Sequence, residues 1–206
     1  MKLSDKVEFI TSVLDELYPE PEIPLEHENN FTFLIAVMLS AQSTDKKVNQ
    51  ITPQLFAKAN TPEKMDKLSE KEIRTIIREI GLAPTKSRNI KKTCKLLLEK
   101  HNGIIPDNFE DLEGLAGVGH KTASVIMAQA FNIPAFPVDT HIHRLAFRWG
   151  LSNGKNVKTT EEDMKSKFEK KNWNRLHLQM IFYGRQYCQA RKSTCECRIC
   201  KGIRDS

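Results

Sequence analysis

Two side chains near the middle of the chain have types and a spacing that suit the cleavage of a C–N bond at a sugar. Lys121 follows a Gly-Val-Gly turn, and Asp139 comes eighteen residues later. A lysine amine can attack an anomeric carbon when its surroundings favour the neutral form. A carboxylate held beside it can stabilise positive charge on the ribose ring and assist proton transfer. A lone lysine is more often a solvated or phosphate-contacting residue, so the interpretation depends on the aspartate.

The residues between this lysine and this aspartate predict how the two could meet. Residues 121–131 have helical periodicity, and such a helix would be about 15 Å long. Residues 132–138 can span at most about 23 Å when extended, which is enough to return to the start of that helix. Pro134 and Pro137 stiffen the return. Asp139 then stands where it can cap the next helix, and a cap holds the carboxylate in a fixed position.

The turn before the lysine, formed by Gly117, Val118 and Gly119, is a candidate binding site. Glycine turns tightly and lets another backbone approach closely. A helix that begins directly after such a turn presents unpaired N–H groups and the positive end of its dipole, and both suit a phosphate. The stretch from Leu112 to Arg144 therefore predicts a helix, a hairpin and a second helix that grip a nucleic-acid backbone.

A cluster of cysteines near the end of the chain is the third group of residues that could carry chemistry. It contains four of the five cysteines: Cys188, Cys195, Cys197 and Cys200. In an intracellular chain such a cluster indicates a metal site rather than a disulfide framework. Four thiolates can ligate a [4Fe–4S] cluster. Zinc is the alternative occupant, because four-thiolate tetrahedral sites are common for it, and a metal-free tail is the third possibility.

The composition is that of an ordinary soluble protein with a modest excess of positive charge. The chain has 206 residues, of which 39% are hydrophobic and 28% charged, and its formal net charge is +6. This length suits one or two compact domains. The longest apolar stretch, Phe31 to Ala41, is too short to span a bilayer. Because the N-terminus lacks a cleavable signal pattern, we expect a cytoplasmic protein.

The positive charge favours a polyanionic partner. Four basic residues near the cysteines predict a basic face that could contact phosphates, whether or not metal binds. These residues are Arg185, Arg191, Lys192 and Arg198.

Apolar residues recur at helical spacing along the whole chain, and no segment alternates as a strand would. The predicted fold class is therefore all-α, with about ten short helices. Residues 31–39 are apolar enough to form a helix that is buried all round. We expect Pro53 to kink or restart its helix, Asp107 and Thr160 to begin two later helices, and the last helix to run from Asn174 to Tyr187.

The motif GLAGVGHKTA at 114–123, followed by VDTHIHR at 138–144, resembles the endonuclease III family of helix-hairpin-helix DNA glycosylases. LSAQSTD at 39–45, Gly81-Leu82, Gly184-Arg185 and the terminal cysteines extend the resemblance over nearly the whole chain. The resemblance implies a fold of two all-α lobes with a C-terminal cysteine cluster. One lobe is a six-helix barrel at 24–131 that includes the hairpin, and the other joins 1–23 to 132–206.

The same resemblance implies roles for individual residues. Lys121 would be the Schiff-base nucleophile and Asp139 its catalytic carboxylate. Gln42, Leu82 and His141 would fill the gap left by an extruded nucleotide, and extrusion is what a duplex-acting glycosylase needs. The cysteines would hold the family's [4Fe–4S] cluster, although their spacing of six, one and two intervening residues contracts the family spacing of six, two and five.

The implied activity is that of a bifunctional base excision repair enzyme. It would remove oxidised pyrimidines such as thymine glycol and then cut 3′ to the abasic site by β-elimination. We expect damaged double-stranded DNA as its partner, no membrane, and a monomer. One alternative is the same fold acting on uracil, a mismatched thymine or an oxidised purine. Another is a non-catalytic DNA-binding hairpin, which would need neither Lys121 nor Asp139.

Overall fold

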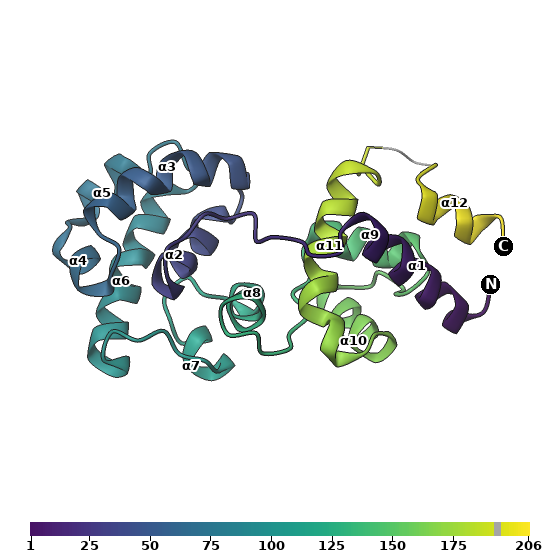
Figure 1. The fold of residues 1–206 in the computed structure, drawn as a ribbon. Helices are drawn as coiled ribbons and strands as arrows, with labels where there is room; N and C mark the ends of the chain where they lie inside the picture. Colours follow the sequence, from purple (N-terminus) through teal and green to yellow (C-terminus); the bar gives the residue numbers. More distant parts are fainter. Residues whose placement is uncertain (192–194) are drawn as a thin grey trace. The chain divides into compact units, whose positions relative to one another are not determined.

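The computed structural model describes residues 1–191 and 195–206, and within them all regular secondary structure is helical, as predicted. The chain forms two compact units (Figure 1). Unit 1 joins Met1–Glu22 to Asn132–Ser206, and unit 2 consists of Ile23–Phe131. The sequence resemblance places the first boundary one residue later, at 23/24, and the second at the same position.

Unit 2 is built around α2 (Asn30–Ser40), in which every residue from Phe31 to Leu39 is buried. Asn29 caps this helix, since its side chain accepts a hydrogen bond from the N–H of Thr32 at 2.9 Å. The helix α2 packs against α3, α6 and α8. The other helices of unit 2 are α3 (Asp45–Lys58), α4 (Pro62–Lys67), α5 (Glu70–Ile76), α6 (Ala83–His101), α7 (Phe109–Glu113) and α8 (His120–Ala130).

Among the local predictions for unit 2, one is tested in part and one is wrong. Pro53 does not restart its helix, because α3 continues through it, while a kink at this residue stays a prediction. The buried face of α3, which includes Val48 and Leu55, offsets the backbone hydrogen bond that proline removes. Asp107 does not cap α7. The cap is Asn108, whose side chain accepts from the N–H of Asp111 at 2.9 Å.

Unit 1 has its core between α1, α9 and α11. Trp149 and Tyr183 are almost completely buried there and meet edge to face, with 5.7 Å between their ring centroids. The helices of unit 1 are α1 (Leu3–Leu17), α9 (Thr140–Arg148), α10 (Val157–Lys167), a 3-10 turn η1 (Lys170–Asn172), α11 (Trp173–Gln186) and α12 (Arg198–Arg204).

The predicted start of α10 at Thr160 is also wrong. Asn156 is the cap, and its side chain accepts from the N–H of Thr159 at 2.8 Å. Thr160 is buried one turn further on, where its hydroxyl donates to the carbonyl of Asn156 at 3.0 Å. A threonine can bond backward within a helix as well as cap one, so residue type alone did not distinguish the two positions.

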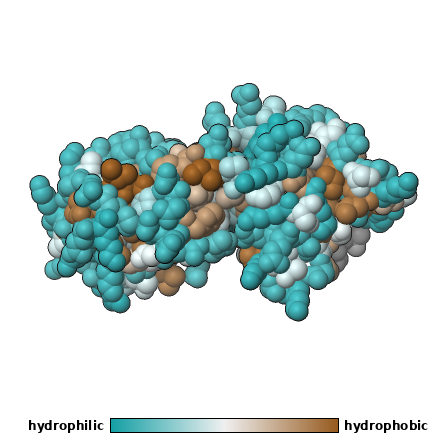
Figure 2. All heavy atoms as spheres, turned by 90° about the horizontal axis from the view of Figure 1, so that it is seen from below, coloured by the Kyte–Doolittle hydropathy of each residue, from teal (hydrophilic) through white to brown (hydrophobic). Residues whose placement is uncertain are grey.

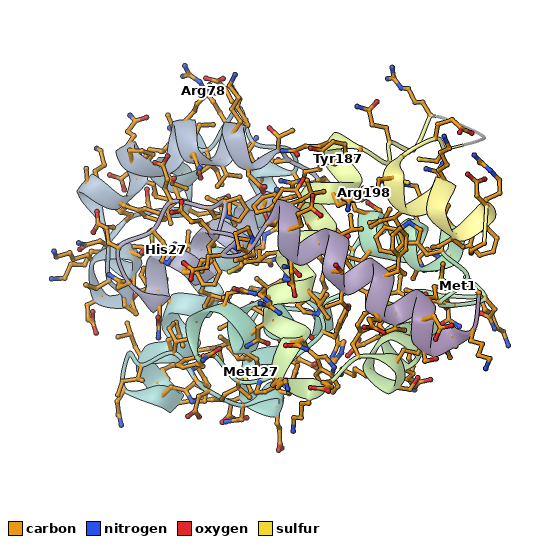
Figure 3. All side chains as sticks on the ribbon, turned by 45° about the vertical axis from the view of Figure 1, so that its right-hand side comes forward. Met1, His27, Arg78, Met127, Tyr187 and Arg198 are labelled. Carbon is orange, nitrogen blue, oxygen red and sulfur yellow. The ribbon has the colours of Figure 1, made fainter. Side chains whose placement is uncertain are left out.

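A helix beyond the predicted last one, α12, packs against α1. Arg198, labelled in Figure 3, forms an ion pair with Glu16 of α1 at 2.7 Å. Gly202 lies so close to Phe9 that a Cβ at this glycine would stand 2.5 Å from the phenylalanine Cζ. The end of the described chain is therefore packed into unit 1.

The surface is largely polar. Figure 2 shows a mostly hydrophilic face on which hydrophobic residues emerge in small groups. Among the described helices, none combines the length and the apolar character needed to cross a bilayer. Leu82 is a large apolar side chain that is 53% exposed.

The hairpin between α7 and α8 turns at Gly117, where φ is +80°. The Val118 side chain is buried beneath it. Thr93 of α6 donates its hydroxyl to the carbonyl of Ala116 at 2.8 Å. The hairpin is thus anchored to the core by Val118 and to α6 by Thr93, while Gly117 and Gly119 remain exposed.

We expect Gly117→Ala to lower the free energy of unfolding by about 1–2 kcal/mol, because an alanine is strained at positive φ. Its Cβ would also stand 2.5 Å from Asn89 Nδ2. Gly119→Ala is the matched control, since its φ is −95° and no atom lies within 4 Å of an added Cβ. Urea unfolding followed by circular dichroism measures both, and equal stability of the two variants would contradict this account of the turn.

Candidate active site and metal centre

Lys121 is the second residue of α8 and is exposed. The opposite face of this helix, with Ala123, Ile126 and Met127, is buried and packs toward α2. Gly119 at the N-cap has no side chain that could accept from the first N–H groups of α8. The first turn of α8 therefore combines backbone donors, a positive dipole end and an exposed amine, a combination that suits a phosphate and a neighbouring sugar.

His120 fastens the start of α8 to α7. Its Nδ1 lies 2.7 Å from Glu113 Oε1, and its ring stacks on Phe109 with 5.5 Å between the centroids. Both partners belong to α7, so these contacts join the start of α8 to the helix that precedes the hairpin. Lys121, the next residue, is held on a well-supported turn.

Gln42 and Leu82 lie in adjoining loops of unit 2. Both are exposed, and both have positive φ, at 56° and 62°. Such values are uncommon for residues other than glycine. The two loops touch, because the N–H of Gly81 donates to Ser43 Oγ at 3.3 Å. Unit 2 thus brings together Gln42 and Leu82, which lie 40 residues apart in the sequence.

In unit 1, Asp139 caps α9 as predicted, and its Oδ1 accepts from the N–H of Ile142 at 2.8 Å. This bond fixes the carboxylate at the start of the helix. His141 lies in the same turn and is partly buried. Burial lowers the pKa of His141, and the neighbouring Asp139 carboxylate acts in the opposite direction. The lowered pKa favours the neutral imidazole.

Two arginines further along α9 connect it to the cysteine cluster. Arg144 Nη2 donates to the carbonyls of Gly184 at 3.0 Å and Cys188 at 2.9 Å. Arg148 Nη1 donates to Cys188 Sγ at 3.3 Å. Sequence reasoning did not identify these roles, although residues four apart share one face of a helix. The helix that begins at Asp139 is thereby bonded to the segment that carries the first cysteine.

The four C-terminal cysteines come together in unit 1, with all four sulfurs within 4.8 Å of one another. Cys188 Sγ and Cys200 Sγ are 3.9 Å apart, far longer than a disulfide bond of about 2.05 Å. Four such thiols are a donor set compatible with a metal centre, an iron–sulfur centre included. The fifth cysteine, Cys94, is buried in α6, and burial raises the pKa of its thiol to about 12.

Three of the four residues of the basic face expected near the cysteines are described. Arg185, Arg191 and Arg198 are all exposed. Arg198 also forms an ion pair with Glu16 of α1. Lys192 lies outside the described residues.

Comparison with known proteins extends these observations. Residues 35–170 match the model of the HhH-GPD superfamily of base excision DNA repair proteins. Endonuclease III of Haemophilus influenzae is 43% identical over 195 residues, which cover 95% of this chain and 92% of that protein. Endonuclease III of Escherichia coli is 42% identical with the same coverage.

Solved structures agree with these relatives. A trapped endonuclease III–DNA covalent intermediate matches with a TM-score of 0.90 at 37% identity, covering 98% of this chain and 99% of that one. A thermostable thymine-DNA glycosylase matches with a TM-score of 0.83 at 22% identity, which shows a shared fold alone. The resemblance predicted from the sequence is confirmed: the chain belongs to the endonuclease III family of helix-hairpin-helix DNA glycosylases and AP lyases, enzymes of base excision repair.

Proposed function

We propose that this enzyme removes oxidised pyrimidines of the thymine glycol type from duplex DNA and then cuts the strand 3′ to the abasic site. The observation that carries the proposal is a lysine in the first turn of the hairpin helix, together with an aspartate that caps α9. A glycosylase that activated only water would not need Lys121. The related covalent endonuclease III–DNA intermediate supports the same chemistry.

In the first step, the Lys121 amine attacks C1′ of the damaged nucleotide. The C–N bond to the base breaks, and the base leaves with the bonding electrons and takes up a proton. The sugar ring opens as nitrogen and C1′ form a protonated Schiff base. The Asp139 carboxylate stabilises the positive charge that develops at the sugar. It accepts the proton that the attacking amine releases and passes it to O4′ as the C1′–O4′ bond breaks.

In the second step, the Schiff base makes the proton on C2′ acidic. Loss of this proton forms a double bond between C2′ and C3′ and breaks the C3′–O3′ bond, so that the 3′ phosphate leaves. Water then hydrolyses the Schiff base and restores the Lys121 amine. The strand is cut without hydrolysis of a phosphodiester.

We propose that the other predicted site residues bind the DNA. The backbone N–H groups at Gly117 and Gly119 would contact phosphate. Val118, whose side chain is buried, would support the hairpin rather than contact DNA through its side chain. Gln42, Leu82 and His141 would occupy the space of the extruded nucleotide. We expect the enzyme to bind DNA as a monomer.

Borohydride trapping on duplex DNA with thymine glycol tests the nucleophile. We expect wild type to form a covalent adduct and Lys121→Ala to form none. Lys158→Ala is the matched control, because Lys158 is also an exposed second residue of a helix, α10. Asp139→Asn should trap about 100-fold more slowly while remaining folded, because asparagine caps a helix as well as aspartate does.

An adduct formed equally well by Lys121→Ala would overturn the assigned nucleophile. The same assay with uracil, a mismatched thymine or an oxidised purine distinguishes the alternative substrates. Binding of these duplexes with neither an adduct nor release of a base on any of them would instead indicate a non-catalytic DNA-binding protein.

For the cysteine tetrad, we propose a structural metal centre that joins the end of α11 to α12. The family resemblance favours a [4Fe–4S] cluster, whereas the sulfur–sulfur distances favour a single zinc ion. Four thiolates around one zinc ion stand about 3.8 Å apart, since each Zn–S bond is about 2.3 Å. The 3.9 Å between Cys188 and Cys200 is close to this value, and all four sulfurs lie within 4.8 Å of one another. In the cluster each thiolate binds a different iron, so its sulfurs stand farther apart. We therefore favour zinc.

Metal analysis of the purified protein decides between the two occupants. We expect a single zinc ion per chain, and loss of that ion in Cys200→Ala. Cys94→Ala is the control. This variant should keep the metal, because Cys94 lies in the other unit. Iron with inorganic sulfide and an absorption band at about 400 nm would establish the iron–sulfur cluster instead.

A further inference from the structure

Lys86, in the first turn of α6, is a buried lysine that the proposed chemistry does not use. It is only 6% exposed. Its Nζ donates to the carbonyl of Leu39 at 2.8 Å and to the carbonyl of Ala41 at 2.5 Å. Burial lowers the pKa of the Lys86 amine. A buried ammonium is costly unless it is well hydrogen-bonded, so this placement calls for a physical reason.

The positive charge of Lys86 is unfavourable for α6, the helix that contains it, and favourable for α2. A cation in the first turn of α6 opposes the dipole of that helix. At the same time its ammonium meets the last carbonyls of α2, which have no partner within the helix and form the negative end of its dipole. Lys86 therefore connects the end of α2 to the beginning of α6.

The end of α2 and the start of α6 adjoin the loops that carry Gln42 and Leu82. Gln42 follows Ala41, and Leu82 is the residue before α6. A Cβ added at Gly81 would stand 3.1 Å from the carbonyl oxygen of Gln42, so the two loops pack backbone against backbone. An exposed leucine and an exposed glutamine are both held in the left-handed region. Strained exposed residues of this kind persist where the surrounding structure holds them for a function.

We infer that Lys86 is a positioning residue that holds the Gln42 and Leu82 loops together, so that the pair enters the DNA helix as one rigid unit. The inference rests on the proposed function. Without the ammonium, the carbonyls of Leu39 and Ala41 lose their donor and the loops can separate. Lys86 then matters when a nucleotide must be extruded from a duplex. It does not matter for Schiff-base chemistry on a strand that has no partner.

The test compares Lys86→Met with Lys91→Met. Lys91 lies on the same helix and also holds a neighbouring segment, donating to the carbonyl of Asp66 and to its Oδ1. The rate of borohydride trapping is measured on an abasic site in duplex DNA and on the same strand alone. We expect Lys86→Met to slow the duplex reaction about tenfold and to leave the single-strand reaction within about twofold of wild type. Lys91→Met should keep the wild-type ratio of the two rates.

The ratio separates positioning from folding, because an unfolded variant loses both reactions. If Lys86→Met does not fold, Lys86→Leu, which also removes the donor, is measured in the same way. An unchanged ratio in the folded variant overturns the inference. An unchanged ratio in Leu82→Ala overturns it as well, because the loop would then have no role in extrusion. If wild type forms no adduct on either DNA, the proposed function itself fails.

A double variant gives an independent check. If Lys86 acts through Leu82, the two substitutions affect one step, and their effects on the duplex rate should not multiply. We expect the double variant Lys86→Met, Leu82→Ala to be no slower than the slower single variant. Multiplied effects would mean that Lys86 acts on a different step and would overturn the inference.

Discussion

The complete burial of α2 is the constraint on which unit 2 depends. A helix with no exposed face from Phe31 to Leu39 must be covered on every side, and its ends must be satisfied by neighbouring groups rather than by water. Asn29 does this at one end and Lys86 at the other. Because the C-terminal partner comes from α6, covering the core also joins the two loops where Gln42 and Leu82 are exposed.

The helix α9 has a similar organising role in unit 1. Its first turn is fixed by the Asp139 cap, and its later turns are bonded to the cysteine segment through Arg144 and Arg148. A metal centre at the tail would therefore stabilise the element that carries the candidate catalytic carboxylate, without taking part in the chemistry. This arrangement gives a physical reason for a structural metal far along the chain from the reacting groups.

Two helix starts were predicted wrongly because neighbouring residues were equally suitable as N-caps. Asn108 rather than Asp107 caps α7, and Asn156 rather than Thr160 caps α10. Each candidate has suitable chemistry, and packing selects the one whose side chain reaches the N–H three residues ahead. The proline at position 53 is tolerated because the buried face of α3 outweighs one lost hydrogen bond. The helix α12 was missed because its stability comes from contact with α1.

The sequence by itself determined the all-α class, the family, the lysine and aspartate at the starts of two helices, and the four thiol donors. These properties reside in residue types and short spacings, which do not need the folded chain. Only the tertiary structure decided that Lys86 reaches Leu39, 47 residues away, and that Arg148 reaches Cys188, 40 residues away. It also decided how closely the four sulfurs approach. Contacts of this kind depend on how whole helices pack, and no local pattern encodes that packing.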